Sequence, residues 1–228
     1  MKYDVIDLGS GRGGCLEFSI KKFKATSHLG IEIQQDRVVN LKKRGYNCIH
    51  GDIVDIVLPE KSSRIVTISH VLEHLNSYSD VEKVLHKAIK TATEFVYIDS
   101  PCFDFDDYLE KLGLKFFWSD WKGHKTKYHQ KDILHTLKNT GIDSCDVLVE
   151  TPYVVDSSSE CVHPLSSPVD QFNYNKEIHA KKPFCTFPDK IYKSYTVFAW
   201  VRNKYRNVEY LKTRSKFKEL NYTRLNGV

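Results

Sequence analysis

Three stretches of the sequence combine glycines, charged groups, imidazoles or indoles at a spacing that could support chemistry. In the first, residues 3–14 (YDVIDLGSGRGG), Asp7 interrupts a short apolar run just before a glycine turn made by Gly9, Gly11, Gly13 and Gly14. Such a turn lets the backbone approach a charged small molecule closely. A carboxylate before it would repel a pyrophosphate group but attract a cation. Asp7 therefore indicates a ligand that carries positive charge.

The second stretch, residues 69–75 (SHVLEHL), contains His70, Glu73 and His74. If this stretch is helical, the four-residue spacing puts both histidines on one face. Two imidazoles and a carboxylate within five residues are groups that move protons or bind metals.

The third stretch, residues 118–134, places two tryptophans beside two histidines: Trp118, Trp121, His124 and His129. An imidazole is the best general base for removing the proton of a substrate hydroxyl, because its ordinary pKa lies near neutral. We predict that His124 or His129 acts as this base, with His74 as the next candidate.

Strands that alternate with helices must position these groups. Apolar runs predict strands that end near Gly9, Glu32, Asp52 and His70, and helical spacing predicts helices over residues 15–24, 81–91 and 131–139. Further strands are expected at residues 94–99, 145–150 and 194–202. This rhythm predicts an α/β fold with a parallel sheet and right-handed crossovers. The ends of the first four strands then meet at the ligand-binding edge of the sheet.

A long insertion separates the last two predicted strands. Residues 151–193 hold five of the seven prolines and several aromatic residues, whereas a connection between neighbouring strands is usually a few residues long. We expect this insertion to lie at the ligand edge and to recognise a ligand.

The first stretch resembles motif I of class I S-adenosylmethionine (SAM) dependent methyltransferases, an apolar strand ending in D/E-x-G-x-G-x-G. Asp7, Gly9, Gly11 and Gly13 match it. The resemblance covers residues 3–150 and the last strand. It implies one domain over residues 1–228, with a doubly wound, mostly parallel seven-stranded sheet whose last strand is antiparallel.

The same resemblance implies SAM as the cofactor and S-adenosylhomocysteine (SAH) as the product. Asp7 and the turn would hold the methionine end, Glu32 would accept hydrogen bonds from the ribose hydroxyls, and Asp52 with Ile53 would line the adenine. The complete set of expected cofactor contacts is Asp7, Gly9, Ser10, Gly11, Gly13, Glu32, Ile33, Asp52, Ile53, Ser69 and His70.

The SHVLEHL stretch resembles the V-L-E-H-L segment of many small-molecule and sugar methyltransferases, so we expect a sugar or another polar small molecule to be O-methylated. It resembles less closely the terminal 2′-O-methyltransferases of small RNAs. Glu73, His74 and His124 match three of the four metal ligands of that family, and His70 stands where its first glutamate should be. This second resemblance implies a divalent metal and RNA ribose methylation as the alternative.

Two further alternatives remain from the sequence. Gly9, Gly11 and Gly14 also spell G-x-G-x-x-G, which would suit an NAD-dependent oxidoreductase. A SAM-binding protein without catalysis would carry the same cofactor residues.

The formal net charge of +5 is concentrated at the C-terminus. Residues 202–228 contain eight basic residues and two acidic ones, Glu209 and Glu219, so their net charge is +6. Residues 1–201 therefore have a net charge of −1. The basic residues are Arg202, Lys204, Arg206, Lys212, Arg214, Lys216, Lys218 and Arg224. We expect a basic tail over residues 203–228, which nucleic acid could contact.

The remaining composition favours a cytoplasmic protein. No apolar run approaches the roughly 20 residues that a membrane-spanning helix needs, and no signal segment precedes the first strand. The six cysteines form no C-x-x-C pair, which argues against a zinc site or a disulfide framework.

Overall fold

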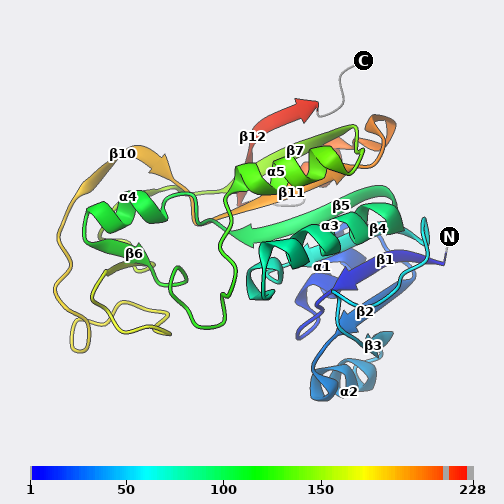
Figure 1. The fold of residues 1–228 in the computed structure, drawn as a ribbon, viewed down its shortest axis with the longest axis horizontal. Helices are drawn as coiled ribbons and strands as arrows, with labels where there is room; N and C mark the ends of the chain where they lie inside the picture. Colours follow the sequence, from blue (N-terminus) through cyan, green and yellow to red (C-terminus); the bar gives the residue numbers. More distant parts are fainter. Residues whose placement is uncertain (1, 213–215, 225–228) are drawn as a thin grey trace.

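A mostly parallel sheet with helices on both faces forms the body of the protein (Figure 1). The structure, a computed structural model, describes residues 2–212 and 216–224. The strand order is β12-β7-β11-β5-β4-β1-β2-β3. These strands are β1 (Tyr3–Leu8), β2 (His28–Glu32), β3 (Cys48–His50), β4 (Ser63–Ser69), β5 (Ala92–Pro101), β7 (Ser144–Glu150), β11 (Ser194–Trp200) and β12 (Phe217–Arg224).

The sheet confirms the predicted fold class. β3, β2, β1, β4 and β5 pair in parallel, and β11 runs antiparallel to both β5 and β7, with Val197 opposite Ile98 and Val147. β12 adds an eighth strand, antiparallel to β7. Part of the segment expected to be a tail therefore belongs to the sheet, whereas Arg214 lies outside the described residues.

Helices cover the two faces because each carries an apolar stripe. They are α1 (Gly14–Lys22), α2 (Gln35–Lys43), α3 (Tyr78–Thr91), α5 (Gln130–Asn139) and the short α6 (Val208–Leu211). In α3, the buried residues Val81, Val84, Leu85, Ala88 and Ile89 recur at helical spacing. The Ser77 side chain accepts a hydrogen bond from the Asp80 amide at 3.2 Å, which fixes the helix start.

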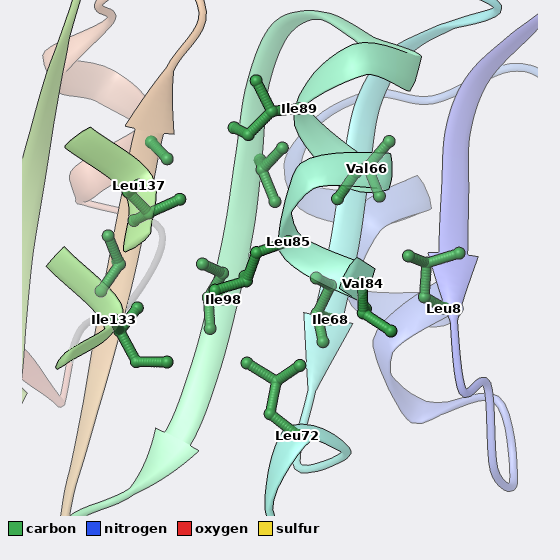
Figure 2. Close-up of a cluster of buried hydrophobic side chains, with 14 of the residues drawn as sticks. Leu8, Val66, Ile68, Leu72, Val84, Leu85, Ile89, Ile98, Ile133 and Leu137 are labelled. Carbon is green, nitrogen blue, oxygen red and sulfur yellow. The ribbon is translucent and has the colours of Figure 1, made fainter. Parts of the chain in front are cut away.

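The main core lies between the sheet and the helices α3 and α5 (Figure 2). Leu85 and Ile89 of α3 face Val66, Ile68 and Ile98 of the strands β4 and β5. On the opposite face, Phe18 of α1 packs against an aromatic cluster that includes Phe95, Phe198 and Trp200. The two cores therefore support the sheet from both of its faces.

The insertion forms a small lobe with the segment that follows β5, at the end toward which β5 points (Figure 1). Its strands β8 (Val154–Asp156) and β10 (Thr186–Ile191) pair with each other, and β9 (Val162–Pro164) pairs with β6 (Leu114–Phe116). With α4 (Asp106–Lys111), these strands bury a separate apolar cluster that contains Phe116, Val162 and Ile191. The lobe therefore lies beside the expected ligand edge.

Two local predictions differ from the structure. The third strand ends at His50 instead of residue 53, because Asp52 starts a turn in which its backbone carbonyl accepts hydrogen bonds from Asp55 and Ile56. Residues 70–74 are not a regular helix: His70 adopts φ 52°, and only the short 3-10 helix η1 (Leu72–His74) follows. None of the helices in the described residues has both the length and the apolar character needed to cross a membrane.

Candidate active site

The glycine turn after β1 requires its glycines for two different reasons. Gly9 has φ 80°, and a Cβ atom there would lie 2.4 Å from Val71 Cγ2. Gly13 has φ 90°, and its Cβ would lie 2.7 Å from Leu41 Cδ2. Gly9 lets the turn pack closely against the segment after β4, and Gly13 lets it pack closely against α2.

A pocket of about 720 Å³ lies over this turn, and we call it the glycine pocket. All of the predicted cofactor contacts except Asp7 and Gly13 line it, namely Gly9, Ser10, Gly11, Glu32, Ile33, Asp52, Ile53, Ser69 and His70. These residues come from the ends of four neighbouring strands, as the sequence predicted. The volume falls within the range of small-molecule sites.

Asp7 is placed beneath the turn. Its side chain has no solvent exposure, and Thr67 Oγ1 of β4 donates a hydrogen bond to Asp7 Oδ1 at 2.6 Å. Burial raises the pKa of Asp7, while the hydrogen bond from Thr67 opposes that shift. Asp7 thus supports the turn from the core side and does not line the pocket.

Glu32 closes one side of the glycine pocket. Its Oε2 accepts a hydrogen bond from the Gly11 amide at 2.7 Å, and its Oε1 accepts one from the Gln34 amide at 2.8 Å. Each carboxylate oxygen has a second lone pair, so the group can still accept hydrogen bonds from a pair of hydroxyls. Next to it, the side chain of Ile33 is 58% exposed and offers an apolar surface to a flat ring.

A second, larger hollow of about 960 Å³ lies beside the glycine pocket, and we call it the aromatic cleft. Five aromatic residues line it: Phe18, Phe117, Trp118, Trp121 and Phe172. His70, His74 and Trp121 line both spaces, so the two meet at these residues. A group held in one pocket can there reach a group held in the other.

A cluster of Glu73, His74 and His124 stands at this junction. One ligand-type atom from each residue lies within 4.8 Å of the others. His74 Nδ1 lies 2.7 Å from the Gly123 carbonyl oxygen, and His124 Nδ1 lies 2.8 Å from that of Trp118. Because a carbonyl only accepts, both Nδ1 atoms carry the proton and both Nε2 atoms have a free lone pair in the neutral rings.

Glu73 is the buried acid of the cluster, with 1% exposure. Its Oε2 accepts a long hydrogen bond from Tyr128 Oη at 3.4 Å, and its Oε1 lies 3.6 Å from His70 Nδ1. No described atom donates a hydrogen bond to that Oε1. A buried carboxylate oxygen of this kind needs a proton, a cation or a ligand.

Burial lowers the pKa of His124, while the negative charge of Glu73 opposes that shift. The neutral imidazole is therefore the form of His124 present at neutral pH, which suits a proton acceptor.

The structure does not bring His129 to this junction. His129 is the N-cap of α5, where its backbone amide donates to Asp132 Oδ2 at 2.8 Å, and it lines neither pocket. Of the three predicted bases, His124 and His74 lie together and His129 serves the start of a helix.

Some residues of the glycine pocket had no place in the sequence prediction. Leu75 and Asn76 follow the SHVLEHL stretch directly, so extending that motif by two positions would have found them. Gln34 and Arg37 belong to none of the three stretches. Lys125 lies in the third stretch but was not predicted to contact the cofactor; its backbone amide donates a hydrogen bond to the Glu73 carbonyl oxygen at 2.8 Å.

Comparisons with known proteins agree with this geometry. Residues 6–93 match the family described as a methyltransferase domain. No curated protein matches the sequence.

Several solved structures share the fold. A SAM-dependent methyltransferase from Archaeoglobus fulgidus is 20% identical, with a TM-score of 0.59 over 86% of this chain and 85% of its own. A putative methyltransferase from Bacillus halodurans is 12% identical, with a TM-score of 0.59 over 89% and 94%. Magnesium protoporphyrin IX methyltransferase from Synechocystis, solved with bound SAH, is 14% identical, with a TM-score of 0.51 over 87% and 74%.

The fold is that of class I methyltransferases. Together with the methyltransferase-domain match, it indicates a SAM-dependent methyltransferase with SAM as its cofactor.

Proposed function

We propose that the protein transfers the methyl group of SAM to a hydroxyl of a sugar or another polar small molecule. The observation that carries this proposal is the junction of the two pockets at His70, His74 and Trp121, beside imidazoles with a free Nε2 lone pair. The glycine pocket would hold SAM, with Glu32 on the ribose and Ile33 with Ile53 on the adenine. The aromatic cleft would hold the acceptor.

The protein's own part in the reaction is mainly positioning. When bound, SAM supplies a methyl carbon already activated by its sulfonium, and it leaves as the neutral thioether SAH. His124 Nε2 would accept the proton of the acceptor hydroxyl as its oxygen bonds to the methyl carbon, and the adjacent Glu73 carboxylate would stabilise the imidazolium. His74, bonded in the same way to a backbone carbonyl, is the second candidate for this role.

Binding and turnover test the proposal separately. Calorimetric titration should show saturable SAH binding and no NAD binding, which also separates a methyltransferase from the oxidoreductase alternative. Incubation with SAM and a panel of sugars and polyols should release SAH together with a methyl ether product. SAH binding without methylation of any hydroxyl would leave the SAM-binding protein without catalysis as the better description.

A second candidate function, metal-assisted 2′-O-methylation of RNA ribose, is favoured by the Glu73, His74 and His124 cluster. The donor set fits a transition metal, because both Nε2 atoms are unprotonated in neutral rings and Glu73 Oε1 lacks a hydrogen-bond donor among the described atoms. A metal there would act as a Lewis acid on ribose hydroxyls. His70 would take the place of a first glutamate, at 3.6 Å from Glu73 Oε1.

Metal binding and acceptor choice distinguish the two functions. In the metal-assisted case, calorimetry with Mn²⁺ or Co²⁺ should show one site that is lost in Glu73→Gln, and a short RNA with a free 3′ end should be methylated. If turnover on a sugar persists in chelator and RNA is not a substrate, the metal-free small-molecule function stands.

We also propose a cytoplasmic location. It is supported by the six cysteines, all of which are free thiols.

A further inference from the structure

The insertion contributes an aromatic ring to the wall of the aromatic cleft. The Phe172 ring centroid lies 5.1 Å from that of Trp121 and 5.4 Å from that of Phe117. Phe172 remains 53% exposed, although it belongs to a lobe with its own apolar cluster. Because Trp121 also borders the glycine pocket, this wall runs from the lobe to the methyl-transfer junction.

A specific contact holds this part of the insertion in place. The Lys122 amide donates to Asp170 Oδ1 at 3.0 Å, and Lys122 Nζ lies 3.6 Å from Asp170 Oδ2. Asp170 adopts φ 62°, a left-handed conformation that persists only where surrounding contacts stabilise it. Lys122 follows Trp121 in the sequence, and Asp170 lies two residues before Phe172. Their contact therefore holds the two rings beside each other as one wall of the cleft.

Two parts of the aromatic cleft differ in charge. Lys193 before β11 and Lys216 before β12 line the cleft near the end of β7, a strand that β11 and β5 separate from β4, and Lys22 of α1 lines the cleft as well. Glu150 pairs with Lys193 at 3.2 Å, and the three lysines and Glu150 of the cleft lining together carry a formal net charge of +2. At the junction, Glu73 is a buried carboxylate that would repel an anion. An anionic group on the acceptor is therefore favoured beside the lysines and disfavoured at the junction.

We propose that the acceptor is a hydroxyl-bearing ring that carries a phosphate monoester. The ring lies against Trp121 and Phe172, the phosphate lies among Lys22, Lys193 and Lys216, and a hydroxyl of the ring reaches His124 and His74. This inference rests on the proposed function and narrows its substrate class. Aromatic side chains bind ring faces, and lysines bind phosphate as point charges. A sugar phosphate and a nucleoside monophosphate share this chemistry.

Tryptophan fluorescence of the SAH-loaded protein tests the proposal, because Trp118 and Trp121 border the cleft while Trp200 is buried elsewhere. The probes are glucose 1-phosphate against glucose, and uridine 5′-monophosphate against uridine. We expect at least one phosphorylated probe to bind about tenfold tighter than its neutral partner, with an affinity that falls as salt is added. The pair that shows this difference identifies the source of the phosphate.

Matched variants assign the two parts of the site. Lys22→Gln combined with Lys216→Gln should weaken the phosphorylated probe about fivefold and leave SAH affinity unchanged. Lys21→Gln, on the same helix but outside the cleft, should bind as the wild type does. Phe172→Ala should weaken phosphorylated and neutral probes by the same factor, whereas Phe184→Ala, an exposed ring of the insertion away from the cleft, should not.

Equal binding of phosphorylated and neutral probes would overturn the proposal, as would unchanged affinity in the double lysine variant. Loss of SAH binding in the wild-type protein is a different result, because it contradicts the proposed function itself. Measuring SAH affinity first keeps the two failures distinct.

Discussion

At the scale of single residues, the site depends on which ring nitrogen of His74 and of His124 carries the proton. The Gly123 and Trp118 carbonyls fix the protons of His74 and His124 on Nδ1 and leave Nε2 for chemistry. The left-handed conformation of His70, whose amide donates to the Asp99 carbonyl at 2.9 Å, places a third imidazole at the junction. The backbone thus determines what these three side chains can do.

Gly9 offers the sharpest test of the glycine pocket. Gly9→Ala introduces a Cβ atom 2.4 Å from Val71 Cγ2 at φ 80°, so the turn must move and SAH affinity should fall at least about tenfold. Gly45→Ala is the matched control, since Gly45 has φ 85° but open space around its Cβ position. Both variants should lose about 1–2 kcal/mol of folding free energy from strain. If Gly9→Ala binds SAH as well as Gly45→Ala does, the turn does not contact the cofactor.

The proton-accepting role of His124 predicts a pH profile. Burial lowers the pKa of His124 below its ordinary 6.5, so the neutral base is present above that value. We expect kcat/KM to stay constant above pH 6.5 and to fall as the pH drops through the lowered pKa. His124→Ala should reduce kcat by about 10²–10⁴-fold.

The same shift has a consequence for stability. Below pH 6.5 the unfolded chain binds a proton on His124 before the folded chain does, so the free energy of unfolding should also decrease there. Thermal unfolding at each pH separates this loss from the catalytic one. A pH profile that is unchanged in His124→Ala would assign the base to another group.

At the scale of elements, α3 packs on the strands that reach the ligand edge. Its apolar stripe packs on β4 and β5, which deliver His70 and Asp99 to the edge of the sheet. The lobe positions the aromatic cleft. The pairing of β6 with β9 joins the insertion to the segment that leads to Trp118 and Trp121.

Leu85→Ala tests the role of α3. Leu85 is fully buried beside Ile98 (Figure 2), and its truncation should lower the free energy of unfolding by about 2–5 kcal/mol. Glu82→Ala, on the exposed side of the same helix, should change it by less than about 0.5 kcal/mol. Urea denaturation of both variants gives the comparison, and equal midpoints would mean that α3 contributes little to the core.

At the scale of the whole molecule, the C-terminal segment is structural as well as basic. β12 pairs with β7 from Phe217 to Arg224 and covers the edge that β7 would otherwise expose. Arg206 adds an ion pair to the buried Asp146 of β7 at 2.7 Å. At least one basic residue of this segment therefore forms an ion pair inside the fold.

Removal of residues 216–228 should make the protein aggregate and lower its Tm. The truncation leaves β7 as an edge strand whose Cys145, Val147 and Val149 are apolar. Removal of residues 225–228 alone keeps β12 and is the control. Light scattering and thermal unfolding measure the difference. A truncated protein that stays monomeric with an unchanged Tm would show that β12 is dispensable.

The sequence by itself determined seven of the eight strands of the main sheet, the ligand edge and most of the residues that line the glycine pocket. Alternating apolar strands and helices fix a parallel fold, and the residues just after Leu8, Ile31, Ile49 and Ser69 must then meet at one edge, because side-chain burial follows local periodicity. His70, Glu73, His74 and His124 were also visible as types and spacings. These are local properties, which a single chain carries without knowledge of its contacts.

Only the tertiary structure decided which of these groups share a site. It buried Asp7 under the turn, left His129 as a helix cap and joined His124 to His74 across fifty residues of chain. It also placed Phe172 of the insertion against Trp121 and drew part of the basic segment into the sheet. Such contacts depend on how separate apolar clusters pack and on backbone carbonyls that orient imidazoles, and neither leaves a periodic pattern in the sequence.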